Sequence, residues 1–321
     1  MGADKQRIIK DPVYGYRRLD PVPRDQELVR YYESHYYDLI RKGGGDAGIR
    51  RLMAGGEEAE RERAWLSATL YADIYELLAQ HAGGKRVLDV GCGTGEALAY
   101  LKDRGFETVG IEPSAEAAAA AKARGIAVYS SPLEKLVEQH KSSGAKPFSA
   151  VLLLNVLEHV PDPVGLIKLT REVLEPRGGV LCVKVPNDFS ELQLAAGKQL
   201  AREPWWIAVP DHINYFDFDS MHTLLERLGF RVVHSQSDFP MEFFLLAGDD
   251  YLGNPEVGSK CHQRRVSFEM ALPGELRRRL YRALATVGAG RCCLVLGRLE
   301  GRRILRSARR DKPVQSRRSS K

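Results

Sequence analysis

Short apolar runs alternate with helical segments in the middle of the chain, from Lys85 onwards. Five runs are predicted to be strands, over residues 86–90, 107–111, 127–129, 149–154 and 179–185. Helices are predicted over residues 95–104 and 115–124, the second being mostly alanine. The runs V-L-L-L-N and V-L-C-V-K-V are continuously apolar, as expected of strands that are covered on both faces. This alternation predicts an α/β fold with a doubly wound, Rossmann-like sheet, mostly parallel and of about seven strands.

The pattern is looser on either side of this region. Before it, we expect an extended arm to about residue 24, a helix over 26–42, a glycine-rich break at 43–48 and a longer helical region over about 57–80. After Pro186, we expect an inserted segment, a helix over 220–228, a strand over 230–235, a polar loop, a basic amphipathic helix over 273–285 and a strand over 292–299. The chain therefore divides into an N-terminal arm and helical cap (1–84), an α/β domain (85–300) with insertions at about 188–210 and 240–290, and a basic tail (301–321).

The net charge of +6 is concentrated in that tail. Residues 301–321 carry nine Lys or Arg and one Asp, a charge of +8, so the remaining 300 residues are near −2. The interpretation we favour is a solvated, disordered terminus, and contact with a nucleic acid stays open as the alternative.

The apolar runs, the N-terminus and the cysteines indicate where the protein is located and which partners it lacks. No apolar run approaches the roughly 18 residues of a membrane span, and the polar N-terminus lacks the apolar core of a signal peptide. The five cysteines form no C-x-x-C pair, which fits buried thiols better than disulfides or zinc. We expect a cytoplasmic protein with no membrane partner and no metal site.

The stretch V-L-D-V-G-C-G-T-G-E, residues 87–96, ends the first strand of this region in a tight turn. Its G-x-G-x-G spacing differs from the G-x-G-x-x-G of dinucleotide-binding folds. Ligands of open α/β sheets bind beyond the carboxyl ends of the strands. Glu112 ends the next strand, where a carboxylate can accept hydrogen bonds from both hydroxyls of a ribose. The same carboxylate would repel a 2′-phosphate, which disfavours NADP.

Three motifs together resemble the class I S-adenosylmethionine-dependent methyltransferases. They are the glycine turn, I-E-P after the second strand, and L-L-L-N-V-L-E-H-V-P-D-P at the fourth. The resemblance is strong over residues 85–185 and weaker over 230–299. The opening L-D-P-V-P-R-D-Q-E-L-V-R-Y-Y-E-S-H-Y-Y is also similar to a branch associated with sugar and natural-product modification, but without the cysteine zinc motif that many of its members carry.

This resemblance implies S-adenosylmethionine as the cofactor and S-adenosylhomocysteine as its product. It assigns the methionine portion to Asp89 and the turn of Gly91, Cys92, Gly93 and Gly95. It assigns the ribose to Glu112 beside Pro113, the adenine edge to Ser131 and Leu133, and the sulfonium side to Asn155 and Val156.

Two histidines are the candidate catalytic residues. His212, in P-D-H-I-N-Y-F after the fifth strand, is the preferred general base, because histidine changes its charge near neutral pH and Asp211 could orient it. His159, in L-E-H-V, is the second, because the resemblance places it near the transferred methyl group. Each has a structural alternative: His159 could cap the helix after Pro161, and His212 could hold a loop in place.

Candidate acceptor contacts are scattered along the chain. They are Tyr37, Trp206, Asp211, Asp249 and His262, the last within a predicted lid loop. Trp205 and Trp206 are adjacent, so one of them is expected in the core.

The predicted function is methyl transfer, by in-line displacement, to a hydroxyl of a sugar or secondary metabolite. The N-V-L-E after the fourth strand differs from the Asn-Pro-Pro-Tyr typical of enzymes that methylate base amines, which favours a small-molecule acceptor. Two alternatives stay open: a methyltransferase acting on RNA or protein with the basic tail as a docking element, and a non-catalytic nucleotide-binding domain.

Overall fold

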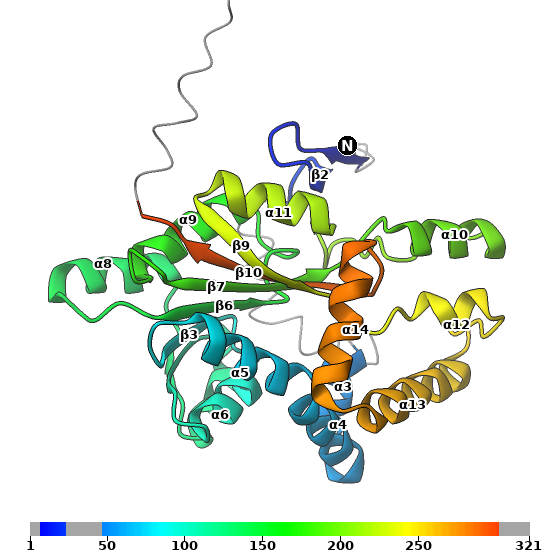
Figure 1. Ribbon diagram of the computed structural model, residues 1–321, viewed down its shortest axis with the longest axis horizontal. Helices are drawn as coiled ribbons and strands as arrows, with labels where there is room; N and C mark the ends of the chain where they lie inside the picture. The colour runs from blue at the N-terminus through cyan, green and yellow to red at the C-terminus, as the bar shows by residue number, and fades with distance from the viewer. Residues whose placement is uncertain (1–6, 24–46, 302–321) are drawn as a thin grey trace, which may run out of the picture.

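The computed structural model describes residues 7–23 and 47–301 (Figure 1). The helix predicted over 26–42, which includes Tyr37, lies outside the described residues, as does the basic tail from residue 302.

A seven-stranded sheet forms the centre of the described chain, in the order β5-β4-β3-β6-β7-β10-β9. The strands are β3 (Arg86–Val90), β4 (Glu107–Ile111), β5 (Ala127–Tyr129), β6 (Ala150–Leu154), β7 (Val180–Pro186), β9 (Phe230–Gln236) and β10 (Cys292–Leu299). β10 pairs antiparallel with both β7 and β9, and the other neighbouring strands pair in parallel. The predicted Rossmann-like sheet, mostly parallel and of seven strands, is confirmed. The strand order reverses beside β3, where folds of this kind bind ligands.

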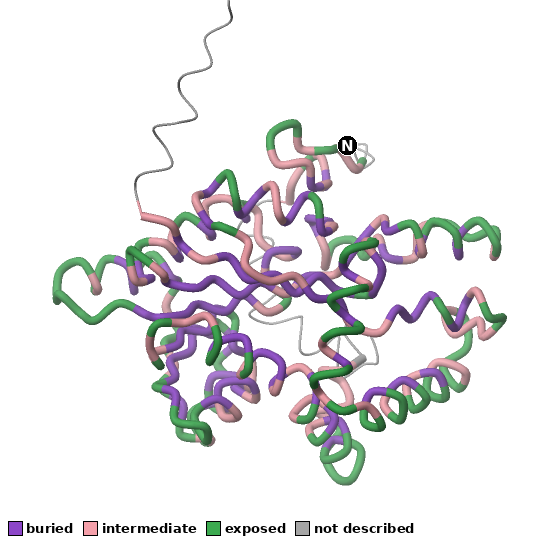
Figure 2. Tube along the Cα trace, viewed as in Figure 1, coloured by how far each residue is buried: buried purple, intermediate pink, exposed green. Residues whose placement is uncertain are grey.

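Helices cover both faces of the sheet (Figure 1). On one face, Leu88 and Val151 belong to a core cluster with α8 (Leu133–Ser143), α9 (Pro163–Val173) and α11 (Phe218–Arg227). On the other face, Val87 and Leu152 pack with α5 (Leu70–His81) and α6 (Glu96–Lys102), while α7 (Ala115–Ala123) packs near β5. Neighbouring strand residues are thus buried on opposite faces, which is why these runs are apolar throughout (Figure 2).

The N-terminal residues form a hairpin, so the prediction of an extended arm was wrong for residues 7–20. β1 (Arg7–Lys10) pairs with β2 (Arg17–Asp20), and β2 pairs with β8 (Asn214–Tyr215). This three-stranded sheet is separate from the central one. Its third strand is only two residues long and lies far along the chain, so no local pattern signals the pairing. The hairpin thereby supports the segment that carries His212.

Six helices lie beyond one end of the central sheet, on the right of Figure 1. They are α3 (Ala47–Ala54), α4 (Gly56–Ala68), α10 (Glu191–Leu200), α12 (Glu242–Leu246), α13 (Pro255–Ala271) and α14 (Gly274–Thr286). The basic helix predicted over 273–285 is therefore confirmed as α14. The helical region predicted over 57–80 is also confirmed, as two helices, α4 and α5, that Thr69 separates.

The two insertions also contain helices that were not predicted. The segment over 188–210 includes α10, which begins with a capping box formed by Ser190 and Gln193. The predicted polar loop after residue 240 is largely α12 and α13. Asn254 caps α13 by accepting hydrogen bonds from two backbone N–H groups, and Pro255 follows at the first helical position. The dipeptide Asn254-Pro255 was thus a helix-start signal that the analysis of the sequence missed.

All five cysteines are buried thiols without disulfides, as predicted. Within residues 7–23 and 47–301, no helix combines the length and the apolar character needed to cross a bilayer.

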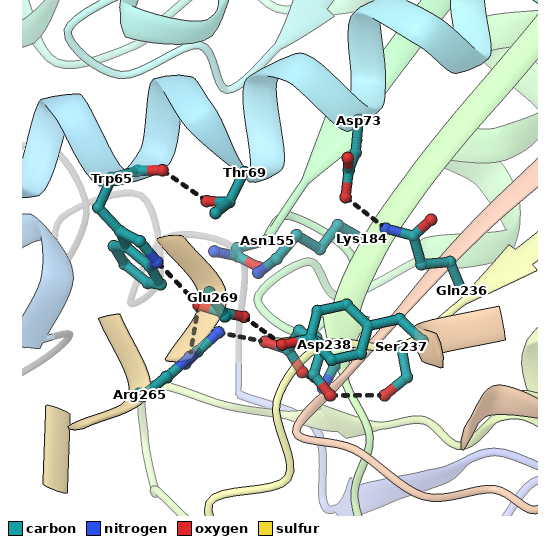
Figure 3. A network of polar contacts seen from close by, with 12 residues as sticks. Trp65, Thr69, Asp73, Asn155, Lys184, Gln236, Ser237, Asp238, Arg265 and Glu269 are labelled. Atoms are coloured by element: carbon teal, nitrogen blue, oxygen red, sulfur yellow. Dashed lines mark hydrogen bonds and ion pairs between the residues drawn. The ribbon is translucent and has the colours of Figure 1, made fainter. Parts of the chain in front are cut away.

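A buried polar network ties α14 to α5 and to the end of β9. The guanidinium of Arg277 donates to Asp73 Oδ1 at 2.8 Å, and Gln236 Nε2 donates to Asp73 Oδ2 at 2.8 Å (Figure 3 shows the Gln236 bond). Both Asp73 and Arg277 are buried. Removing one partner of such a pair leaves an uncompensated charge inside the protein, which costs much more than a surface pair would.

We expect Asp73→Ala to lower the free energy of unfolding by about 3–5 kcal/mol, because Arg277 loses its partner in a buried site. The control is Glu57→Ala, which removes an exposed pair with Arg61 and should cost less than about 1 kcal/mol. Urea unfolding followed by circular dichroism measures both. Equal losses in the two variants would show that the Asp73 network is not a buried constraint.

Candidate functional site

A cavity of about 2290 Å³ opens at the carboxyl ends of the parallel strands. It exceeds the roughly 300–1000 Å³ usual for one small ligand, so it has room for two reactants. It is lined by most of the residues predicted for the site: Asp89, Gly91, Cys92, Gly93, Glu112, Pro113, Ser131, Leu133, Asn155, Val156, His159, Trp206, Asp211 and His212. The structure therefore brings together residues that lie far apart in the sequence.

The glycine turn holds the chain close to the sheet. Gly91 has a φ of 77°, and a Cβ there would lie 2.9 Å from Val156 Cγ2. Gly95, with a φ of 76°, does not line the cavity: it caps α6, and a Cβ there would lie 2.9 Å from Ala121 Cβ. Gly95 thus serves helix packing, while Gly91 leaves space at the cavity wall.

The Cys92 side chain packs in the apolar core beside the cavity. Its side chain belongs to the core cluster that includes Leu98, and its Sγ fills the space that a Cβ on Gly110 would need. Burial raises the pKa of the Cys92 thiol. The thiol is therefore kept neutral and inside the core.

Glu112 is held in position by two backbone donors. Gly93 N donates to Oε2 at 2.8 Å, and Ser114 N donates to Oε1 at 2.9 Å. Burial raises the pKa of this carboxyl, and the two N–H groups partly oppose that rise. Each oxygen still has a lone pair for a ligand, so the carboxylate is oriented to accept two further hydrogen bonds.

Asp89 is a buried acceptor that lacks a donor. It is 2% exposed, and its Oδ1 has no hydrogen-bond partner among the described residues. Burial, together with the nearby charge of Glu112, raises the pKa of Asp89 well above its ordinary value. A buried oxygen without a partner in the protein is where a donor from a ligand fits.

Asn155 and Lys184 form a polar pair at the ends of β6 and β7. Asn155 has a left-handed φ of 56°, its N donates to Lys184 O at 2.8 Å, and its Oδ1 accepts from Lys184 Nζ at 2.9 Å (Figure 3). Lys184 was not among the predicted site residues. Its signal was a single cation in the otherwise apolar run V-L-C-V-K-V.

The two candidate histidines lie side by side. Their rings are 5.0 Å apart between centroids, with an interplanar angle of 73°. The backbone oxygen of Glu158 accepts hydrogen bonds from Ile213 N and Asn214 N, and the Asn214 side chain donates to two further carbonyls of the 157–160 segment. These bonds fix the loop of His159 against the loop of His212.

Asp211, one carboxylate that could orient His212, contacts His159. The Asp211 carbonyl oxygen lies 2.7 Å from His159 Nδ1, and its carboxylate oxygen lies 3.6 Å from the same atom. The alternative that His159 caps the next helix was wrong. Asp162 caps α9 by accepting from Gly165 N at 2.7 Å.

Glu158, His159 and His212 each offer one possible metal-ligand atom, all within 4.8 Å of one another. A carboxylate and two imidazoles suit a divalent transition metal. The prediction of no metal site did not consider this set, because His212 is remote from the other two in sequence.

The remaining acceptor candidates divide into two groups. Trp206 is buried, edge-to-face against Trp205 and Phe189, while Trp205 is half-buried. Asp249 and His262 do not line the cavity. Asp249 pairs with Arg264 at 2.6 Å, and His262 lies on α13, not on a loop, with its Nε2 2.9 Å from Glu62 Oε2.

Three buried carboxylates on the cavity wall were missed. Glu158, Asp188 and Glu242 are 1–3% exposed, and each has one oxygen without a hydrogen-bond partner in the described part of the chain. Burial raises the pKa of each carboxyl. Asp188 comes two residues after the end of β7, which is a sequence signal for this edge of the sheet.

Comparison with known families gives one broad match. A family model described as a methyltransferase domain matches residues 60–235, more than half of the chain. Similar curated proteins are ubiquinone biosynthesis O-methyltransferases. The one from Cronobacter sakazakii is 32% identical over 108 residues, which is 32% of this chain and 44% of the relative. The one from Aliivibrio fischeri is 30% identical over 99 residues, 30% and 42% of the two chains. This chain thus spans less than half the length of these relatives.

Solved structures show more distant similarity. A SAM-dependent methyltransferase from Archaeoglobus fulgidus has a TM-score of 0.48 and 19% identity, and the match covers 82% of this chain and 99% of that one. The cyclopropane synthase MmaA2 from Mycobacterium tuberculosis has a TM-score of 0.48 and 18% identity, with 87% and 99% covered.

The raised carboxyl pKa values predict how stability depends on pH. A carboxyl whose pKa is higher in the folded chain stabilises the fold below its unfolded pKa, and this contribution is lost as the pH rises through the folded pKa. For Asp188 and Glu242 the ordinary values are 3.8 and 4.5. The ligand-free chain should therefore lose stability between about pH 5 and about pH 8. The double variant Asp188→Asn/Glu242→Gln should lose less, as measured by urea unfolding at both pH values. A steeper loss in the variant would contradict the sign of these shifts.

Proposed function

The chain belongs to the family of methyltransferase domains, and we propose that it transfers a methyl group from S-adenosylmethionine to a hydroxyl of a small molecule. The observation that carries the proposal is Glu112. Two backbone N–H groups orient its carboxylate at the cavity wall, beside the glycine turn and the unsatisfied oxygen of Asp89. The acceptor class we favour is a sugar or another secondary metabolite. The O-methyltransferase names of the curated relatives support an oxygen as the methylated atom.

The residues present fit this cofactor. Asp89 Oδ1 is a buried acceptor suited to the ammonium group of the methionine portion. Glu112 can accept from both ribose hydroxyls, and Gly91 and Gly93 line the cavity without side chains. Ser131 and Leu133 would lie along the adenine, and Asn155 with Val156 along the sulfonium side.

When bound, S-adenosylmethionine supplies an electrophilic methyl group on a good leaving group. The protein's task is then to align the acceptor oxygen with that carbon, which can contribute about 7–11 kcal/mol in well-oriented systems. An O–C bond forms, the C–S bond breaks, and the acceptor's proton must leave. His212 would take that proton, since it lines the cavity beside His159.

The residues proposed for the cofactor and the proposed base His212 have separate tasks. Glu112 and Asp89 would determine cofactor affinity, whereas His212 would act on the acceptor. Variants of the two groups should therefore fail in different measurements.

For Glu112→Gln, we expect the affinity for S-adenosylmethionine to fall about tenfold to a hundredfold, because an amide replaces a charged double acceptor. Isothermal titration calorimetry measures the effect. The control is Glu107→Gln at the opposite end of the same strand, where the glutamate pairs with Arg86. Unchanged binding in Glu112→Gln would remove the ribose assignment.

For His212→Ala, we expect methyl transfer to fall about a hundredfold or more, because the acceptor proton loses its base. Affinity for S-adenosylmethionine should stay within about twofold, since the histidine does not hold the cofactor in this proposal. Isotopically labelled methyl donor, incubated with metabolite extracts and analysed by mass spectrometry, gives both the product and the rate. His140→Ala on α8, which does not line the cavity, is the control. Full activity in His212→Ala would transfer the role to another residue.

A further inference from the structure

Asp188 and Glu242 line the same cavity as the residues proposed for the cofactor. Asp188 comes two residues after β7, and Glu242 begins α12, which packs against α10. Burial raises the pKa of Asp188, and the charge of Glu242 adds to that rise. Both line the same cavity as His212.

Each of these carboxyls has an unsatisfied oxygen. Asp188 Oδ2 and Glu242 Oε2 are buried without hydrogen-bond partners among the described residues. Buried polar atoms in native proteins are nearly always satisfied, so such atoms indicate a missing donor. Asp89 shows the same feature at the place proposed for the cofactor's ammonium group.

Negative charge exceeds positive charge around the pair. Glu158 raises the pKa of Asp188, and Asp238 raises that of Glu242. Arg291 opposes both shifts. Arg265 also opposes the shift of Glu242, but it already pairs with Asp238 and Glu269 (Figure 3). Lys184, nearer Glu158, donates to Asn155. A further cation would therefore be favourable here.

Aromatic side chains line the same part of the cavity. Trp205, Trp206 and Tyr251 are on its wall, and Trp206 packs on Phe189, the residue after Asp188. Aromatic faces attract organic cations, and their combination with carboxylates is suited to an ammonium group.

We propose that Asp188 and Glu242 form a subsite that binds a cationic amine of the acceptor. This inference rests on the proposed function and narrows it: the acceptor carries an amine at one end and the methylated hydroxyl at the end near His212. A neutral polyol could donate hydrogen bonds to both oxygens, but only a cation would also compensate the charge of the two carboxyls in their ionised form.

The test compares two probes of nearly the same shape. Benzylamine is a cation near neutral pH, whereas benzyl alcohol is neutral. Each is titrated into the full-length protein saturated with S-adenosylhomocysteine, and binding is followed by saturation-transfer NMR. We expect benzylamine to bind at least about tenfold more tightly than the alcohol, as hydrogen bonds to charged groups are the stronger ones.

The variant Asp188→Asn/Glu242→Gln should remove this preference, lowering benzylamine affinity about tenfold with no change for the alcohol. The matched control is Asp249→Asn/Asp250→Asn, which removes the same two charges from residues that do not line the cavity. Equal binding of the two probes to the native chain would overturn the proposal. So would an amine preference that survives in the subsite variant or disappears in the control.

Titration of S-adenosylhomocysteine into every variant separates this inference from the function on which it rests. If the nucleoside binds and the amine preference is absent, only the amine subsite is wrong. If the nucleoside does not bind to the native chain, the proposed function itself fails.

Discussion

The parallel strands β3, β4, β6 and β7 end at one edge of the sheet, and the whole site depends on that shared edge. Parallel pairing forces the chain to return through a helix after each strand. Residues that follow successive strands are therefore distant in sequence and adjacent in space. Asp89, Glu112, Asn155 and Asp188 each lie at or just after such a strand end. The core that holds the strands in place is apolar, while polar residues lie at the strand ends.

Polar contacts join α4, α13 and α14 at the wall of the cavity. Glu269 on α13 accepts hydrogen bonds from Trp65 Nε1 on α4 and from Tyr281 Oη on α14, and pairs with Arg265 (Figure 3). Such networks fix geometry strongly when every member has a partner, because an unpaired buried charge is costly. Against this background, the unsatisfied oxygens of Asp188 and Glu242 stand out. The same interior that satisfies Glu269 leaves them without donors.

The sequence was sufficient for the central sheet because its signals are local. Continuous apolar runs separated by helical segments predicted five strands between residues 86 and 185. The weaker pattern after Pro186 predicted the other two, over 230–235 and 292–299. The hairpin over residues 7–20 could not be predicted in this way, since β2 pairs with a two-residue strand far along the chain. His262 was wrongly placed on a loop because the cap signal at Asn254-Pro255 was not used. Glu158, Asp188 and Lys184 were missed for another reason: burial and the lack of a partner are properties of packing, which residue type does not reveal.

The backbone and the side chain of Glu158 have different roles. Its backbone oxygen accepts from Ile213 and Asn214 and so joins the two histidine loops. Its side chain is buried with one oxygen unsatisfied, beside His159 and within reach of a site shared with His212. A change of side chain leaves the backbone bonds in place, so the loops can keep their contact while the electrostatics between the histidines change. The arrangement of the two imidazoles is therefore fixed by the backbone, while the Glu158 side chain lines the cavity beside them.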